Sequence, residues 1–149
     1  MNAIAQPEIE RAPGALMELG RYIETIEEAY EFMLAYAAQG RRDERGATGP
    51  GIRHFLSRLD AALGALPHCA AGACLELGLK DDCNGILAVL AEDARKAQAL
   101  VRFVLSRETI GSQLADNLNA SIHVRALLTD LFVLDESLKV AAAARPGEI

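Results

Sequence analysis

The chain contains no tryptophan, and aromatic residues make up only 5% of its 149 residues. Its apolar fraction of 51% consists mostly of alanine and leucine. Aromatic and β-branched side chains are enriched in strands, whereas alanine and leucine are strong helix formers. The composition therefore favours an all-α fold, and a chain of this length is about one domain long.

Long hydrophobic runs are also missing. No stretch reaches the roughly 18 apolar residues without charge that a membrane-spanning helix requires. The segment Met1 to Glu8 has neither the basic start nor the apolar run of a signal peptide. We therefore expect a cytoplasmic protein that makes no membrane contact. In a reducing cytosol its three cysteines, an odd number, stay as thiols.

Positive charge is in deficit, because 15 Lys and Arg residues face 21 Asp and Glu residues, which gives a net charge of −6. Non-specific binding of nucleic acid depends on clustered Lys and Arg that displace counterions from the phosphates. Arg41, Arg42 and Arg45 form the one basic cluster, and they stand beside Asp43 and Glu44. We therefore expect no nucleic-acid partner.

Catalytic and phosphate-binding motifs are absent as well. The chain has no Gly-x-Ser-x-Gly elbow, no Gly-x-Gly-x-x-Gly and no Gly-x-x-x-x-Gly-Lys loop. Glu24, Glu27, Glu28 and Glu31 suggest a carboxylate-bridged metal pair, but that chemistry also needs Glu-x-x-His, which does not occur. We interpret Glu24, Glu28 and Glu31 as a solvated helix face, assign no catalytic residue and expect no cofactor. The balance of the motifs is against an enzyme.

Apolar residues at intervals of three and four predict four amphipathic helices. The first runs from Ala12-Pro13 to Gly40, the second covers 52–66, the third starts at Asp81-Asp82 and continues to about 104, and the fourth covers 113–144. The prediction is an antiparallel four-helix bundle in one domain at 12–144. Residues 1–11 and 145–149 are predicted to be flexible tails.

Two connections carry particular expectations. The segment 40–51 is rich in glycine and charge and has no large apolar residue to anchor it, so it predicts a mobile loop. Pro67 is expected to end the second helix, because proline disfavours helical geometry in the residue before it. Residues 67–82 are therefore predicted to be a connector.

The predicted helix at 113–144 contains neither glycine nor proline. Its segment 126–134 places large apolar groups on almost every side, which is typical of a helix that is buried from several directions. A four-helix chain covers only one face of such a helix, and most soluble oligomers are symmetric homo-oligomers. We therefore predict self-association through an interface of Leu127, Leu128, Leu131, Phe132 and Leu134.

The same helix carries Asp116, His123 and Asp130 at intervals of seven residues. A carboxylate can orient an imidazole that binds a metal or acts as a base. Neighbours two turns apart are separated by about 10 Å, so the three could act together only around a ligand or a partner helix. The alternative is a polar seam that fixes helix register.

A second cluster consists of His68, Cys69, Cys74 and Cys83. Zinc takes four such ligands, but structural zinc sites usually pair ligands two to four residues apart, which this spacing does not match. A redox-active thiol pair is another possibility. The simplest interpretation makes Cys74 a small apolar core residue and the other three residues incidental.

Two functions compete on this basis. The first is a non-catalytic interaction module, a regulatory, accessory or assembly protein that forms a homo-oligomer and binds a protein partner through helical surfaces. The second is a helical bundle that binds a metal or small ligand at His123 with Asp116 or Asp130, or at the cluster of His68 and the cysteines. The missing motifs and the surplus apolar surface favour the interaction module.

Overall fold

The computed structural model describes residues 14–46 and 48–144, which form five α-helices and no strand. The helices are α1 (Ala15–Ala37), α2 (Ile52–Glu76), α3 (Lys80–Leu105), α4 (Ser112–Asn119) and α5 (Ile122–Ala143). The predicted all-α fold is confirmed. The predicted tails and the predicted helix start at Ala12-Pro13 lie outside the described residues. None of the helices in the described ranges is long and apolar enough to cross a bilayer.

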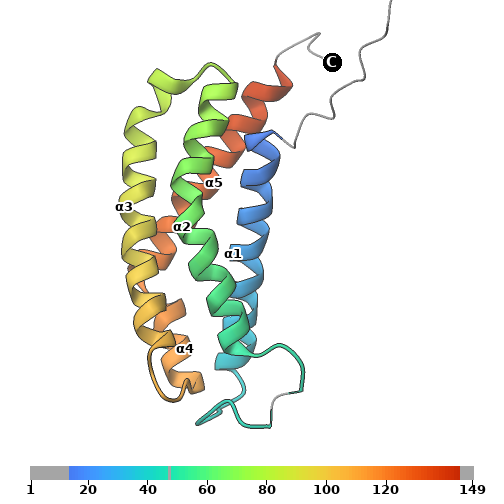
Figure 1. Cartoon of the computed structure of the whole chain (residues 1–149), viewed down its shortest axis with the longest axis vertical. Helices are drawn as coiled ribbons and strands as arrows, with labels where there is room; N and C mark the ends of the chain where they lie inside the picture. The colour runs from blue at the N-terminus through green and yellow to red at the C-terminus, as the bar shows by residue number, and fades with distance from the viewer. Residues whose placement is uncertain (1–13, 47, 145–149) are drawn as a thin grey trace, which may run out of the picture.

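The four long helices lie side by side along the long axis of the molecule (Figure 1). Helices α1 and α3 run in one direction, and α2 and α5 run in the other. Helix α1 packs along α2, α2 along α3, and α3 along α5, whereas α1 and α5 touch only sparingly. The short helix α4 packs mainly against α1 at the end of the molecule where the 40–51 loop also lies. Among the neighbouring pairs of long helices, α1 and α5 are therefore the most loosely packed.

The core consists of the apolar stripes that the periodicity predicts. On α1 the buried residues follow intervals of three and four, and α5 repeats the pattern. Burying each large aliphatic side chain contributes about 1.5–3 kcal/mol. The largest fully buried side chains come from α1, α2, α3 and α5 and from the segment before α4: Leu19, Met33, Ile52, Leu56, Leu63, Leu66, Leu90, Val101, Ile110, Leu127, Leu131 and Leu138.

Helix α2 continues through Pro67, so the predicted helix end at 66 and the predicted connector at 67–82 are wrong. The nine residues after Pro67 stay helical, and they bury Cys69, Ala70, Ala73 and Cys74 on the same face as the preceding turns. Packing of this face outweighs the backbone hydrogen bond that proline cannot donate. The true connection is the short turn at 77–79, where Gly78 has a φ of 70° that only glycine adopts readily.

The third helix starts close to where the sequence predicts. As Asp is a favoured N-cap residue, Asp81 and Asp82 would be expected to cap the helix, but they lie inside the first turn of α3 and Leu79 occupies the cap position. Their negative charges still stabilise the helix, because the N-terminal end of a helix is partially positive. On the outer side of α3, Lys96 lies 3.8 Å from Glu92, as the spacing of four predicts.

The predicted helix at 113–144 is two helices. The chain leaves helical geometry at Ser121, whose ψ is 131°, and the Ser121 hydroxyl accepts a hydrogen bond from the His123 N–H at 3.2 Å. Such a serine is a favourable N-cap. Helix α4 packs mainly against α1, whereas α5 packs mainly against α3. The break at Ser121 therefore lets consecutive parts of the chain pack against two different helices. No glycine or proline marks this break in the sequence.

The loop at 40–51 is anchored by polar groups, contrary to the expectation of an unanchored loop. The Arg41 carbonyl accepts from the Ser112 N–H at 2.8 Å, and the Arg41 N–H donates to the Ser112 hydroxyl at 2.8 Å. A Cβ on Gly111 would lie 2.9 Å from the Arg42 carbonyl oxygen, so the contact requires glycine at this position. Residue 47 lies outside the described residues.

Candidate interaction surface

The five residues of the predicted interface on α5 divide into two groups. Leu127, Leu131 and Leu134 are buried within the single chain, and Leu131 has no exposed surface. Leu128 is half-buried, and Phe132 is 47% exposed. The other helices of the same chain therefore bury three of the five side chains, and Leu128 and Phe132 remain near the surface.

Leu128 and Phe132 line a shallow groove between α5 and α1, which we call the seam groove. Tyr30, Glu27 and Glu31 of α1 form its other side, and its volume is about 220 Å³. Of the neighbouring pairs of long helices, α1 and α5 contact each other least, and the groove lies along this pair. It is an apolar depression with two carboxylate-bearing residues on one wall, which suits the side chain of another helix.

A second groove lies between α3, α4 and α5, and we call it the end groove. Its volume is about 450 Å³. The most exposed apolar side chains on its walls are Ile122, at 74%, and Phe103, at 57%. The Arg107 guanidinium stacks over the Phe103 ring at 4.7 Å from the ring centre. The remaining lining residues are Leu100, Val104, Leu114, Asn117, Leu118, Ser121 and His123.

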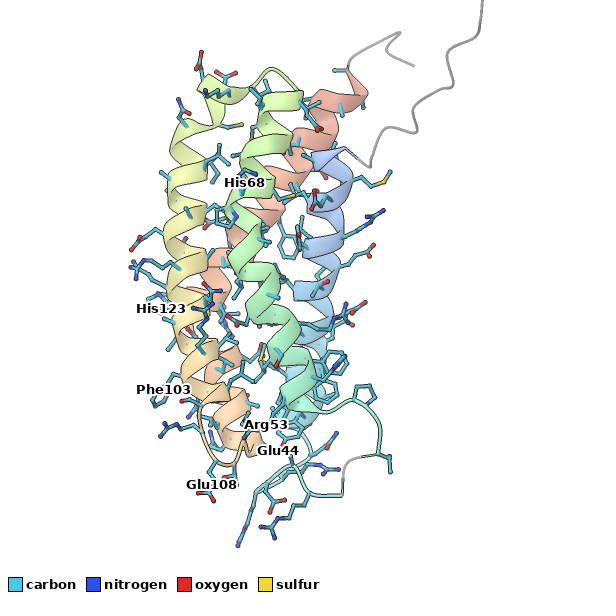
Figure 2. All side chains as sticks on the ribbon, in the orientation of Figure 1. Glu44, Arg53, His68, Phe103, Glu108 and His123 are labelled. Carbon is cyan, nitrogen blue, oxygen red and sulfur yellow. The ribbon has the colours of Figure 1, made fainter. Side chains whose placement is uncertain are left out.

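Sequence reasoning missed the end groove because it treated α4 and α5 as one helix. The groove exists only because the chain turns at Ser121, so that Leu114 and Leu118 of α4 face the same space as Phe103 of α3. The one signal available in the sequence was Ser121 itself, a good helix cap within an otherwise unbroken helical pattern. Figure 2 shows Phe103 and His123 on the same side of the molecule.

The predicted trio of Asp116, His123 and Asp130 is not brought together. Asp116 lines a separate depression of about 270 Å³ beside Gly40 and Arg41. His123 lies in the end groove, and Asp130 lies against Asp93 of α3. Because the chain breaks at Ser121, Asp116 belongs to α4, whereas His123 and Asp130 belong to α5.

The predicted cluster of His68 and three cysteines is also divided. His68 is exposed on the outer face of α2, far along the molecule from His123 (Figure 2). The Cys69 thiol donates to the Ala15 carbonyl at 3.5 Å, whereas Cys74 interacts with Cys83 across the 77–79 turn. Burial raises the pKa of Cys69 to about 11, and burial and the neighbouring Cys83 thiol raise the pKa of Cys74 to about 12.

The remaining candidates are placed as follows. Within the described ranges, the structure brings no three or more His, Cys, Asp or Glu side chains into a group that could hold a metal ion. Glu24, Glu28 and Glu31 are exposed on α1, in agreement with the predicted solvated face. The third histidine, His54, stands off the apolar stripe of its helix in the sequence; it is exposed and lies edge-on to the Phe55 ring, with 5.3 Å between ring centres.

We compared the chain with models of known protein families, with curated protein sequences and with solved structures. None of the three comparisons finds a match. A function must therefore be inferred from the chain itself, that is, from its grooves, its exposed apolar side chains and its buried polar groups.

Proposed function

We propose that the chain is a non-catalytic helical interaction module, an antiparallel four-helix bundle that self-associates through α5 and the seam groove. The observation that supports this most directly is Phe132, a large aromatic side chain that stays 47% exposed on the wall of an apolar groove. Aromatic residues are enriched at the centres of protein interfaces, where they supply a large part of the binding energy.

The position of the groove supports a symmetric arrangement. Phe132 and Leu128 stand on α5, and Tyr30 stands on the neighbouring α1. In a two-fold dimer the same patch is used twice, so the Phe132 side chain of each copy can enter the seam groove of the other. Fully burying a phenylalanine contributes about 1.5–3 kcal/mol, and the half-exposed Phe132 would contribute part of that in each copy.

Other exposed apolar residues on α5 extend this surface. Val133 is 57% exposed and Val140 is 60% exposed, so the outer side of α5 continues to present apolar groups beyond the groove. A stable interface buries about 800 Å² on each partner, which is more than one groove of this size can supply. The proposed interface therefore includes the outer face of α5 from Phe132 toward its C-terminal end.

A second candidate function is the binding of a small apolar molecule in the end groove beside His123. The observation in its favour is the volume of about 450 Å³, which is within the range of ligand sites, together with a largely apolar lining. The groove opens on a different side of α5 from the seam groove, so the two functions can be tested separately.

The test compares wild type with Phe132→Glu by sedimentation velocity over a range of protein concentrations. A charge at this position should convert the oligomer to a monomer while the melting temperature changes little, because Phe132 is not part of the core. Leu75→Glu is the matched control, since Leu75 is 62% exposed on α2 and lines neither groove. An oligomer in Phe132→Glu equal to that of wild type would contradict the proposal.

A further inference from the structure

Asp93 of α3 and Asp130 of α5 meet where these two helices pack together. The Oδ2 atom of Asp130 is buried and has no hydrogen-bond donor among the described residues. The Asp93 carboxyl lies within hydrogen-bonding reach of the Asp130 carboxyl. Two carboxyl groups can hydrogen-bond to each other only when one of them carries a proton, because an ionised carboxylate is an acceptor alone.

Within the described ranges, neither Asp93 nor Asp130 forms an ion pair. Lys96 stands three residues after Asp93 on α3, but its ammonium group lies 3.8 Å from Glu92. Arg95 also pairs with Glu92, at 2.7 Å. On α5, Lys139 pairs with Asp135 at 2.7 Å. The charged group that raises the pKa of Asp130 is the Asp93 carboxyl on α3.

The consequence for protonation follows from these surroundings. Burial, then the hydrogen bond and the negative charge of Asp93, raise the pKa of Asp130 to about 7. A pair of adjacent carboxylates gives up its first proton readily and its second only at much higher pH, so this value belongs to the pair. At acidic pH the two groups share a proton, and at alkaline pH both are ionised and repel each other.

We propose that Asp93 and Asp130 form a proton-dependent latch that fastens α5 to α3 when they share a proton and loosens it when both are ionised. The proposal does not depend on self-association, because both residues belong to the same chain and lie outside the linings of the two grooves. It assigns to this helix pair a response to pH in the neutral range.

The direction of the effect is fixed by linkage. An unfolded aspartate loses its proton near pH 4, whereas the folded pair keeps a proton until about pH 7. Between these values the folded state binds more protons than the unfolded state, so the latch's contribution to stability is fully present below about pH 4 and is lost as the pH rises through 7. One linked proton changes the ratio of folded to unfolded protein by at most about tenfold per pH unit.

The test follows urea unfolding of wild type, Asp130→Asn and Asp93→Asn from pH 4.5 to pH 8.5. An asparagine amide can donate to the remaining carboxylate without a shared proton, so each variant should gain stability relative to wild type as the pH rises, by up to about tenfold per unit in the folded-to-unfolded ratio. Asp116→Asn is the control, because Asp116 is exposed on α4 and should leave the wild-type pH profile unchanged.

A second measurement uses wild-type protein alone, so it does not depend on whether a variant folds. In carboxyl-labelled wild-type protein, the NMR titration of Asp130 should have its midpoint above pH 6. A midpoint below pH 5, or pH profiles of both asparagine variants that run parallel to wild type, would overturn the latch.

Discussion

The Glu44 carboxylate lies between the Arg53 guanidinium and the Ile110 backbone N–H. Oε2 of Glu44 accepts from Nε of Arg53 at 3.0 Å, and Oε1 accepts from Nη2 of Arg53 at 3.1 Å and from the Ile110 N–H at 2.6 Å. The same guanidinium donates to the backbone carbonyls of Leu105, Arg107 and Glu108. One ion pair therefore ties the loop at 40–51 to the turn between α3 and α4, at the lower end of Figure 2.

Replacing Glu44 with glutamine should lower the free energy of unfolding at pH 7 by about 1–2 kcal/mol. The pair is partly exposed, so solvent screening keeps the effect below that of a fully buried pair. The Arg53 hydrogen bonds, followed by that from Ile110, lower the pKa of Glu44 despite its partial burial. Its stabilisation is therefore present above about pH 4.5 and is lost as the pH falls through the lowered pKa.

Urea unfolding at pH 7 and at pH 3 tests this prediction. The difference between wild type and Glu44→Gln should shrink at the lower pH. Asp43→Asn is the control, because Asp43 pairs with Arg45 at 3.7 Å on the surface and should cost little. Equal losses at the two pH values would show that the charge of Glu44 contributes nothing.

Pro67→Ala should raise the stability of the protein. Proline inside a helix removes one backbone hydrogen bond and crowds the preceding turn, at a cost of up to about 3 kcal/mol. Because α2 is already helical on both sides of Pro67, alanine can restore the bond to the Leu63 carbonyl without moving the chain. Thermal melting should show a higher midpoint for the variant. A lower midpoint would mean that the core requires a bend at Pro67.

The three cysteines should react slowly with Ellman's reagent in the native protein and rapidly in urea. All three are buried, and the raised pKa values of Cys69 and Cys74 leave very little thiolate at pH 8. Full reaction of the native protein within the mixing time would show that the α2–α3 end opens readily. A Cys69→Ser variant identifies which thiol accounts for any early reaction.

Leu131 and Phe132 are neighbours in sequence and should respond differently to a charge. Leu131 is fully buried in the core, so Leu131→Asp should destabilise the chain by several kcal/mol or prevent its folding. Phe132→Asp should leave the melting temperature close to that of wild type and lower the oligomeric state. Equal melting temperatures of Leu131→Asp and wild type would contradict the burial of α5 in the single chain.

Much of the fold could be predicted from the sequence, because apolar periodicity reports directly which helix face is buried. The regular positions on α1 and α3 became core residues for this reason. Pro67 misled the prediction because local propensity is weaker than the packing of a continuous apolar face. The break at Ser121 was missed because its cause is tertiary, namely that α4 follows α1 while α5 follows α3.

The candidate site was less predictable. The sequence showed that α5 is apolar on almost every side, but only the structure separates Leu131, which the chain covers itself, from Phe132, which it leaves exposed. Asp130 stands out in the sequence as a polar residue on this helix, but its partner Asp93 is on another helix at a spacing that no motif describes. Contacts of this kind depend on how two helices are set against each other.

Native mass spectrometry of the untreated protein tests the central claim most directly, since it reports subunit number and bound mass together. Self-association through α5 predicts an integral multiple of the chain mass with no added ligand, and a shift to the single-chain mass in Phe132→Glu. A wild-type protein that remains a monomer at every concentration would contradict the account. A monomer that carries an additional small mass would transfer the assignment to the end groove beside His123.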